Sequence, residues 1–245
     1  MIHGSLWSKE VRGYRRLFLL FFLLAVITLI LFPYIGNQVI VLPGGFRLWE
    51  GITVSTFGDN PWISWSAVAL LQFSAVLALL LGYSSLAGEL SAGTTAYLLS
   101  KPVSRREIVT TKIIAGLTLL AFFVYGLSLI FVAPLFRSGF QVDIIELFLS
   151  CTVTFIICAV IYITTVLFSS FFTRTWTAGL FSAIFWGLYF ALGFFEPIRN
   201  YSIIHQLRIN GYWEGQQTFI PIGLGIFIGG LLLELAVMVW EKREY

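Results

Sequence analysis

The polar residues whose spacing suggests chemistry gather in residues 88–112, between two long apolar stretches. Ser104 and Glu107 stand three residues apart, which is the spacing of a capping box. In that motif the two side chains bond free backbone N–H groups at the start of a helix. Glu89 and Gly93 lie upstream, in a glycine-containing run that lacks the lysine of a phosphate-binding loop. The segment therefore predicts a capped helix start, and it offers no phosphate-binding loop of its own.

A second candidate is an acidic residue inside an apolar stretch, Glu234. A carboxylate within a membrane span is a functional candidate by default, here for a substrate pathway or a gate. Glu234 also lies six residues before Trp240, which fits an interfacial or hydrogen-bonded structural role. Gly225 and Gly229 of the same stretch have the GxxxG spacing that allows close helix approach. Structural packing, a subunit interface and a flexible gate are the alternatives for these glycines.

Catalysis and metal binding lack the residue sets that they need. An intramembrane enzyme requires facing groups such as paired carboxylates or a Ser–His pair, but no apolar stretch contains a histidine and only one contains an acid. His3 and His205 are isolated, and Cys151 and Cys158 have the character of small buried hydrophobes. We expect no catalytic residue and no metal site in this chain.

The composition indicates whether the apolar stretches lie in a soluble protein or in a membrane. Hydrophobic residues make up 58% of the 245, and charged residues only 11%, against roughly 25% in a soluble domain. A soluble protein of this size has too little interior for so many apolar side chains. A soluble enzyme, a secreted disulfide scaffold and a disordered chain are excluded. The net charge of +3 gives no indication of nucleic-acid binding.

Six apolar stretches predict six membrane-spanning helices. A helix needs about 20 apolar residues to cross a bilayer, whereas barrel strands would be about ten residues of alternating polarity. We expect an all-α integral membrane protein with one transmembrane domain over residues 17–240 and a tail at 241–245. The predicted spans are about residues 17–35, 62–87, 113–136, 147–172, 177–195 and 218–240.

The lysines and arginines orient the spans. With a cytoplasmic N-terminus, four of the 15 basic residues face outward, namely Arg47, Arg137, Arg199 and Arg208, and the remaining eleven (15 − 4) face inward. Cytoplasmic loops carry an excess of basic residues. Both termini are therefore predicted to be cytoplasmic.

Residues 1–16 form a basic leader before the first span. Apolar residues recur there at helical spacing, with basic residues on other faces: Trp7, Val11, Tyr14 and Phe18 against Lys9, Arg12 and Arg16. One interpretation is a leader that only sets topology; the other is an amphipathic elbow helix in the membrane plane. The apolar run that follows exceeds the 7–15 residues of a signal peptide, so we expect a retained span.

The connection at residues 88–112 is much longer than the one at 173–176, and Pro102 punctuates it. Thr94 to Leu99 reads as one or two helical turns along the inner membrane surface. The expected apolar contact is Tyr97, Leu98 and Leu99, framed by Glu89, Lys101, Arg105 and Arg106. The alternative is a plain cytoplasmic loop whose basic residues set topology.

This segment resembles the ABC-2 type permease family, the membrane subunits of ATP-binding-cassette exporters. The matching positions are Glu89, Gly93, Thr94, Leu98, Leu99, Pro102, Ser104, Arg105, Glu107 and Lys112. The match covers about 30 residues, from Leu86 to Gly116. Ser91-Ala92 departs from the family, whose members usually carry a basic residue between the Glu and the Gly.

The resemblance implies a mechanism. The inner loop would be a coupling helix seated on a separate ATPase subunit, which holds the ATP and Mg, and two permease chains would surround a pathway. It implies export of an amphipathic, peptide-like or antibiotic-like substrate across a plasma membrane, with a prokaryotic source favoured by the separate chains. A membrane scaffold or sensor of the same fold and an intramembrane enzyme are the alternatives.

Overall fold

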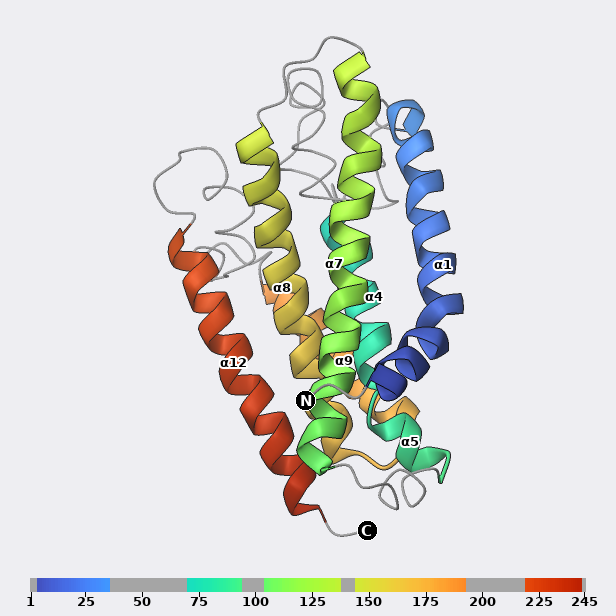
Figure 1. Cartoon of the computed structure of the whole chain (residues 1–245). Helices are drawn as coiled ribbons and strands as arrows, with labels where there is room; N and C mark the ends of the chain where they lie inside the picture. Colours follow the sequence, from blue (N-terminus) through green and yellow to red (C-terminus); the bar gives the residue numbers. More distant parts are fainter. Residues whose placement is uncertain (1–3, 36–69, 94–103, 138–143, 193–218, 244–245) are drawn as a thin grey trace, which may run out of the picture.

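The computed structural model describes residues 4–35, 70–93, 104–137, 144–192 and 219–243, and all regular structure within these ranges is helical. The long helices run side by side as a bundle, and the start of α1 and the end of α12 lie toward the same end of it (Figure 1). The described residues form the helices α1 (Gly4–Ile35), α4 (Leu71–Tyr83), α5 (Ala87–Ser91), α7 (Arg105–Arg137), α8 (Ile144–Phe171), α9 (Thr175–Leu192) and α12 (Phe219–Lys242).

Helix α8 is the centre of the bundle and packs against α4, α7, α9 and α12. Its side chains Ile161 and Tyr162 are fully buried, as are Leu81 of α4 and Phe123 of α7. The outward faces carry large apolar side chains instead, including Leu23 of α1, Phe181 of α9 and Phe227 of α12. Exposed apolar faces on every outer helix are the pattern of a protein whose solvent is lipid.

Three helices in the described residues are long and apolar enough to cross a membrane: Arg105–Ala133, Leu147–Phe171 and Ile222–Lys242. With 33 residues, α7 extends about 50 Å at 1.5 Å per residue, which exceeds the roughly 30 Å of a hydrocarbon core. The structure thus accounts for the third, fourth and sixth predicted spans. The first, second and fifth predicted spans, which correspond to α1, α4 and α9, remain predictions.

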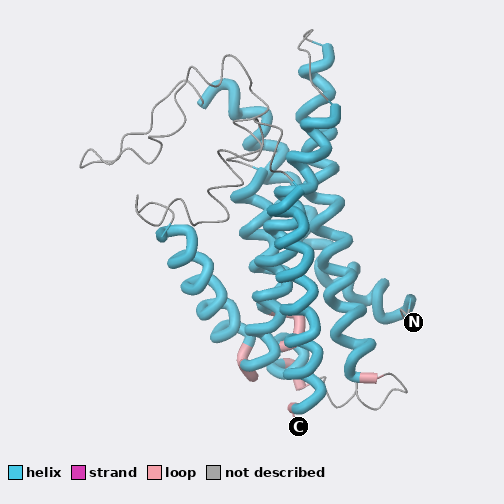
Figure 2. Tube along the Cα trace, turned by 90° about the vertical axis from the view of Figure 1, so that its left-hand side faces the viewer, coloured by secondary structure: helices cyan, strands magenta, loops and turns pink. Residues whose placement is uncertain are grey.

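Two element boundaries differ from the sequence prediction. The second span was expected to continue to Ala87, but α4 ends at Tyr83, and a turn at residues 84–86 separates it from α5. The leader was expected to be distinct from the first span, but α1 runs from Gly4 to Ile35 as one helix. Its first turns nevertheless point away from the rest of the helix (Figures 1 and 2).

Candidate functional site

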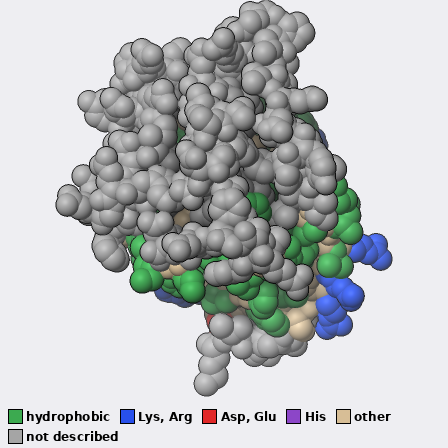
Figure 3. All heavy atoms as spheres, turned by 90° about the horizontal axis from the view of Figure 1, so that it is seen from above, with side chains coloured by type: hydrophobic (Ala, Val, Ile, Leu, Met, Phe, Trp, Pro, Cys, Tyr) green, Lys and Arg blue, Asp and Glu red, His purple; other side chains and the backbone are tan. Residues whose placement is uncertain are grey.

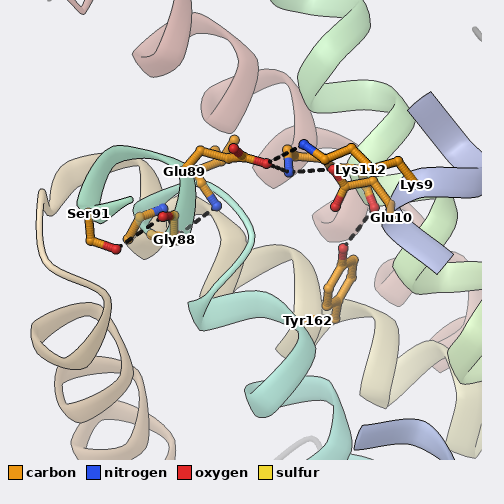
Figure 4. Close-up of polar contacts among 10 residues, drawn as sticks. Lys9, Glu10, Gly88, Glu89, Ser91, Lys112 and Tyr162 are labelled. Atoms are coloured by element: carbon orange, nitrogen blue, oxygen red, sulfur yellow. Dashed lines mark hydrogen bonds and ion pairs between the residues drawn. The ribbon is translucent and has the colours of Figure 1, made fainter. Parts of the chain in front are cut away.

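A chain of ion pairs joins three helices at the end of the bundle where α1 begins. The Lys112 ammonium lies 2.7 Å from Glu10 Oε1 and 3.2 Å from Glu89 Oε1, and Lys9 Nζ lies 3.2 Å from the same Glu89 oxygen. Figure 4 shows these side chains meeting from α1, α5 and α7. The side chains of Lys112, Glu10 and Glu89 are 5%, 9% and 14% exposed. We call these four residues the ion network; two ammonium and two carboxylate groups make it neutral.

A buried tyrosine, Tyr162, and a partly buried one, Tyr14, lie beside the ion network. The Tyr162 hydroxyl of α8 donates a hydrogen bond to the backbone carbonyl of Lys112 at 3.0 Å. Gly116, one helical turn further along α7, has no room for a Cβ because the Tyr162 hydroxyl occupies that space. Tyr14 covers the network from α1, and burial, together with the charge of Glu10, raises the pKa of its phenol well above the usual value. Tyr14 therefore stays neutral at physiological pH.

The turn between α4 and α5 is held by a hydroxyl from α8. Ser169 Oγ accepts hydrogen bonds from the N–H groups of Leu86 at 3.1 Å and Ala87 at 2.8 Å, and it donates to the carbonyl of Tyr83 at 3.1 Å. These are backbone groups that the break in the helix leaves without an intrahelical partner. The buried side chain of Ser169 is thus the physical reason why α4 ends before the predicted boundary.

Helix α5 also rests on the start of α9. Thr175 Oγ1 donates to the carbonyl of Ala87 at 3.3 Å and lies 2.7 Å from Ser91 Oγ. Gly93 then ends the segment with φ of +67°, a left-handed conformation that glycine adopts without strain. Contacts to α7, α8 and α9 consequently fix α5 up to the residue where the connecting loop begins.

The other end of the loop is a capped helix start. The backbone N–H of Glu107 donates to Ser104 Oγ at 3.2 Å, and the N–H of Ser104 donates to Glu107 Oε2 at 3.2 Å. This reciprocal pattern confirms the predicted capping box, and α7 begins at the next residue, Arg105. The predicted loop residues Thr94, Tyr97, Leu98, Leu99, Lys101 and Pro102 lie outside the described residues.

Arginines bind the start of α7 to the ends of two other helices. Arg105 donates to the carbonyls of Glu241 at 3.1 Å and Arg243 at 2.7 Å, and Arg243 in turn donates to the carbonyls of Ser170 and Phe172. Cationic side chains commonly satisfy the last carbonyls of helices in this way. The first turn of α7 is therefore joined to the C-terminal ends of α12 and, through Arg243, of α8.

Glu234 pairs with Arg106, whose guanidinium lies 2.8 Å from Glu234 Oε1. Both side chains are about half exposed, at 49% and 56%, so this contact resembles a surface ion pair. Gly225 and Gly229 face α8: a Cβ on Gly225 would overlap Ile156, and one on Gly229 would lie 3.7 Å from Ile163. These contacts are those expected for structural packing within the chain, and they leave a pathway or gate role untested.

Sequence reasoning missed several residues that build this site. Glu10 stands alone as an acid in a basic leader, four residues before Tyr14 and hence on the same helix face; that was a usable signal. No such signal marks Tyr162, Ser169 or Thr175 in the sequence. Each of them bonds a backbone group that lies at least 50 residues away along the chain. In the described part of the chain, no group of three metal-ligating side chains comes together.

Comparison with known protein families gives a match over most of the chain. Residues 9–219 match the family model described as ABC-2 family transporter protein, which is most of the chain and includes the ion network, the loop and both of its anchored ends. A comparison with curated proteins found no match.

Proposed function

The chain belongs to the ABC-2 family of transporter proteins, and from that premise we propose that it is the permease subunit of an ATP-driven exporter. The family assignment makes it a non-catalytic membrane subunit with several apolar helices. Transporters of this class generally work with an ATPase. Our proposal adds that the ATPase is a separate polypeptide, that it holds ATP and Mg, and that it acts on residues 94–103.

The observation that carries the proposal is that both ends of the loop are anchored in the bundle. Upstream, α5 is bonded to α8 through Ser169, to α9 through Thr175 and to α7 through the Glu89–Lys112 pair. Downstream, the capping box opens α7, a continuous helix of 33 residues. Packed interfaces pass on movements because they do not deform continuously. An ATPase that displaced the loop would therefore move α5 and α7 as rigid elements.

Within this proposal the site residues divide into two roles. Tyr97, Leu98 and Leu99 supply the apolar contact with the ATPase, flanked by Thr94, Lys101 and Pro102. Gly93, Ser104, Glu107, Glu89, Arg105 and Arg106 position the loop, because the structure engages them in bonds or backbone geometry within this chain.

The transport pathway forms between this chain and a second permease chain, identical or related. Its substrate is amphipathic, peptide-like or antibiotic-like and leaves through the plasma membrane of a prokaryotic cell. In this scheme Gly225 and Gly229 let α12 slide on α8, and the Arg106–Glu234 pair restrains that movement from the loop side. Pathway opening is thus linked to the first turn of α7.

The test is a double substitution in the loop, Leu98→Asp with Leu99→Asp, in the chain coexpressed with its copurifying ATPase. We expect the variant to fold and reach the membrane but to lose the ATPase on purification, because charged side chains cannot fill an apolar contact. The matched control, Leu98→Met with Leu99→Met, keeps the ATPase. Full retention of the ATPase by the aspartate variant would show that the loop is not the docking site. An ATPase that stays coupled while no cargo moves would favour the scaffold or sensor.

A further inference from the structure

The leader of α1, residues 4–16, presents a basic face on the side of the helix opposite its buried residue Glu10. At 3.6 residues per turn, Arg12, Arg15 and Arg16 lie about 200°, 140° and 240° around the axis from Glu10. All three arginines are exposed, whereas Glu10 is buried. The arginine face and the buried face of the leader are therefore set apart by helical geometry.

The ion network fixes which way this helix is turned. Glu10 bonds Lys112 at 2.7 Å with both side chains buried, and Val11 and Tyr14 pack against the core beside it. Rotation of the leader about its own axis would break a buried ion pair and expose those apolar contacts. The orientation of the leader is therefore fixed, and its three arginines are directed away from the bundle.

The arginine face is directed to the side of the helix bundle and not toward its end. Viewed along the bundle, Lys and Arg side chains project beyond its edge on the side where α1 lies (Figure 3), and the leader turns outward from the bundle at its end (Figure 2). The same helix continues into the apolar face of α1, where Leu19, Leu20 and Leu23 are exposed. A stripe of arginines directly beside a lipid-facing stripe lies at the depth of the phospholipid phosphates.

We infer that Arg12, Arg15 and Arg16 form a binding surface for the headgroups of anionic phospholipids in the inner leaflet. Guanidinium groups bind phosphate oxygens through paired N–H donors, and basic residues next to a membrane attract anionic lipid. The sideways direction favours lipid over an ATPase, which would approach residues 94–103 from the end of the bundle. The inference is independent of the proposed function, because lipid binding is measured without an ATPase.

The experiment measures lipid selectivity of the full chain. The protein is reconstituted in bilayers of equal parts phosphatidylcholine and phosphatidylglycerol, and the association of each spin-labelled lipid with it is compared by electron paramagnetic resonance. We expect preference for phosphatidylglycerol in the unaltered chain, weakened by salt. Arg15→Gln with Arg16→Gln should reduce that preference, by up to roughly fivefold for each arginine removed. Arg15→Lys with Arg16→Lys should retain part of it.

The matched control is Arg174→Gln with Lys242→Gln, which removes two exposed basic residues from the starts and ends of other helices. This variant should keep the selectivity of the unaltered chain. Equal loss in both glutamine variants would overturn the inference, since net charge alone would then set the preference. Unchanged selectivity in the Arg15/Arg16 variant overturns it too, and if that variant also released the ATPase, the surface would be a protein contact.

Discussion

Replacing Lys112 with methionine removes a cation that touches both carboxylates of the ion network. Glu89 keeps Lys9 at 3.2 Å, but Glu10 loses its 2.7 Å partner while 9% exposed. Deleting one member of a buried ion pair leaves an uncompensated buried charge and costs about 3–5 kcal/mol. We expect the free energy of unfolding to fall by about 3 kcal/mol, the low end of that range.

The assay is denaturant unfolding of the purified chain in detergent micelles, run as a double-mutant cycle. Glu10→Gln alone should cost less than Lys112→Met, since Lys112 then retains Glu89. The double variant removes both charges together and should be more stable than the sum of the single losses predicts, by at least about 1 kcal/mol. Lys242→Met, on an exposed lysine, is the control and should change stability by less than about 0.5 kcal/mol. A Lys112→Met loss as small as that of the control, or strictly additive losses, would refute the reasoning that the network is buried and coupled.

The remaining predictions concern the elements that hold the loop and α12. Ser169→Ala should lower the unfolding free energy by about 1–3 kcal/mol, because three backbone groups lose a buried partner; amide exchange at Leu86 and Ala87 should accelerate, and unchanged exchange would contradict the assignment. Gly93→Ala should cost about 1–2 kcal/mol because its φ is +67°, whereas thermal unfolding of helical Gly88→Ala should show no loss. Gly225→Ala should cost about 1–3 kcal/mol by overlap with Ile156, and equal stability of Gly225→Ala and Gly230→Ala would rule out the close approach.

Features set by neighbouring residues could be read from the sequence. The capping box needs only Ser104 and Glu107 three residues apart, and the structure has it as predicted. Apolar run length likewise located α7, α8 and α12, because a bilayer demands about 20 apolar residues whatever the tertiary contacts.

Features set by packing could not be read in the same way. The end of α4 depends on Ser169, 86 residues from the carbonyl to which it donates, and no local pattern marks that serine among the many of the apolar stretches. Arg106 and Glu234 were both candidates, for different roles, and only the contact of α7 with α12 pairs them. Glu89 carried the family resemblance, yet its two lysine partners come from α1 and α7, so its positioning role emerged with the fold.

The most direct test of the central claim is purification of the tagged chain from its native membranes in a gentle detergent, with identification and counting of the subunits that accompany it. The account predicts an ATP-binding-cassette ATPase at one copy per permease chain, together with a second permease chain in the same complex. Recovery of the intact chain without any ATPase, under conditions that preserve a control complex, would contradict the account.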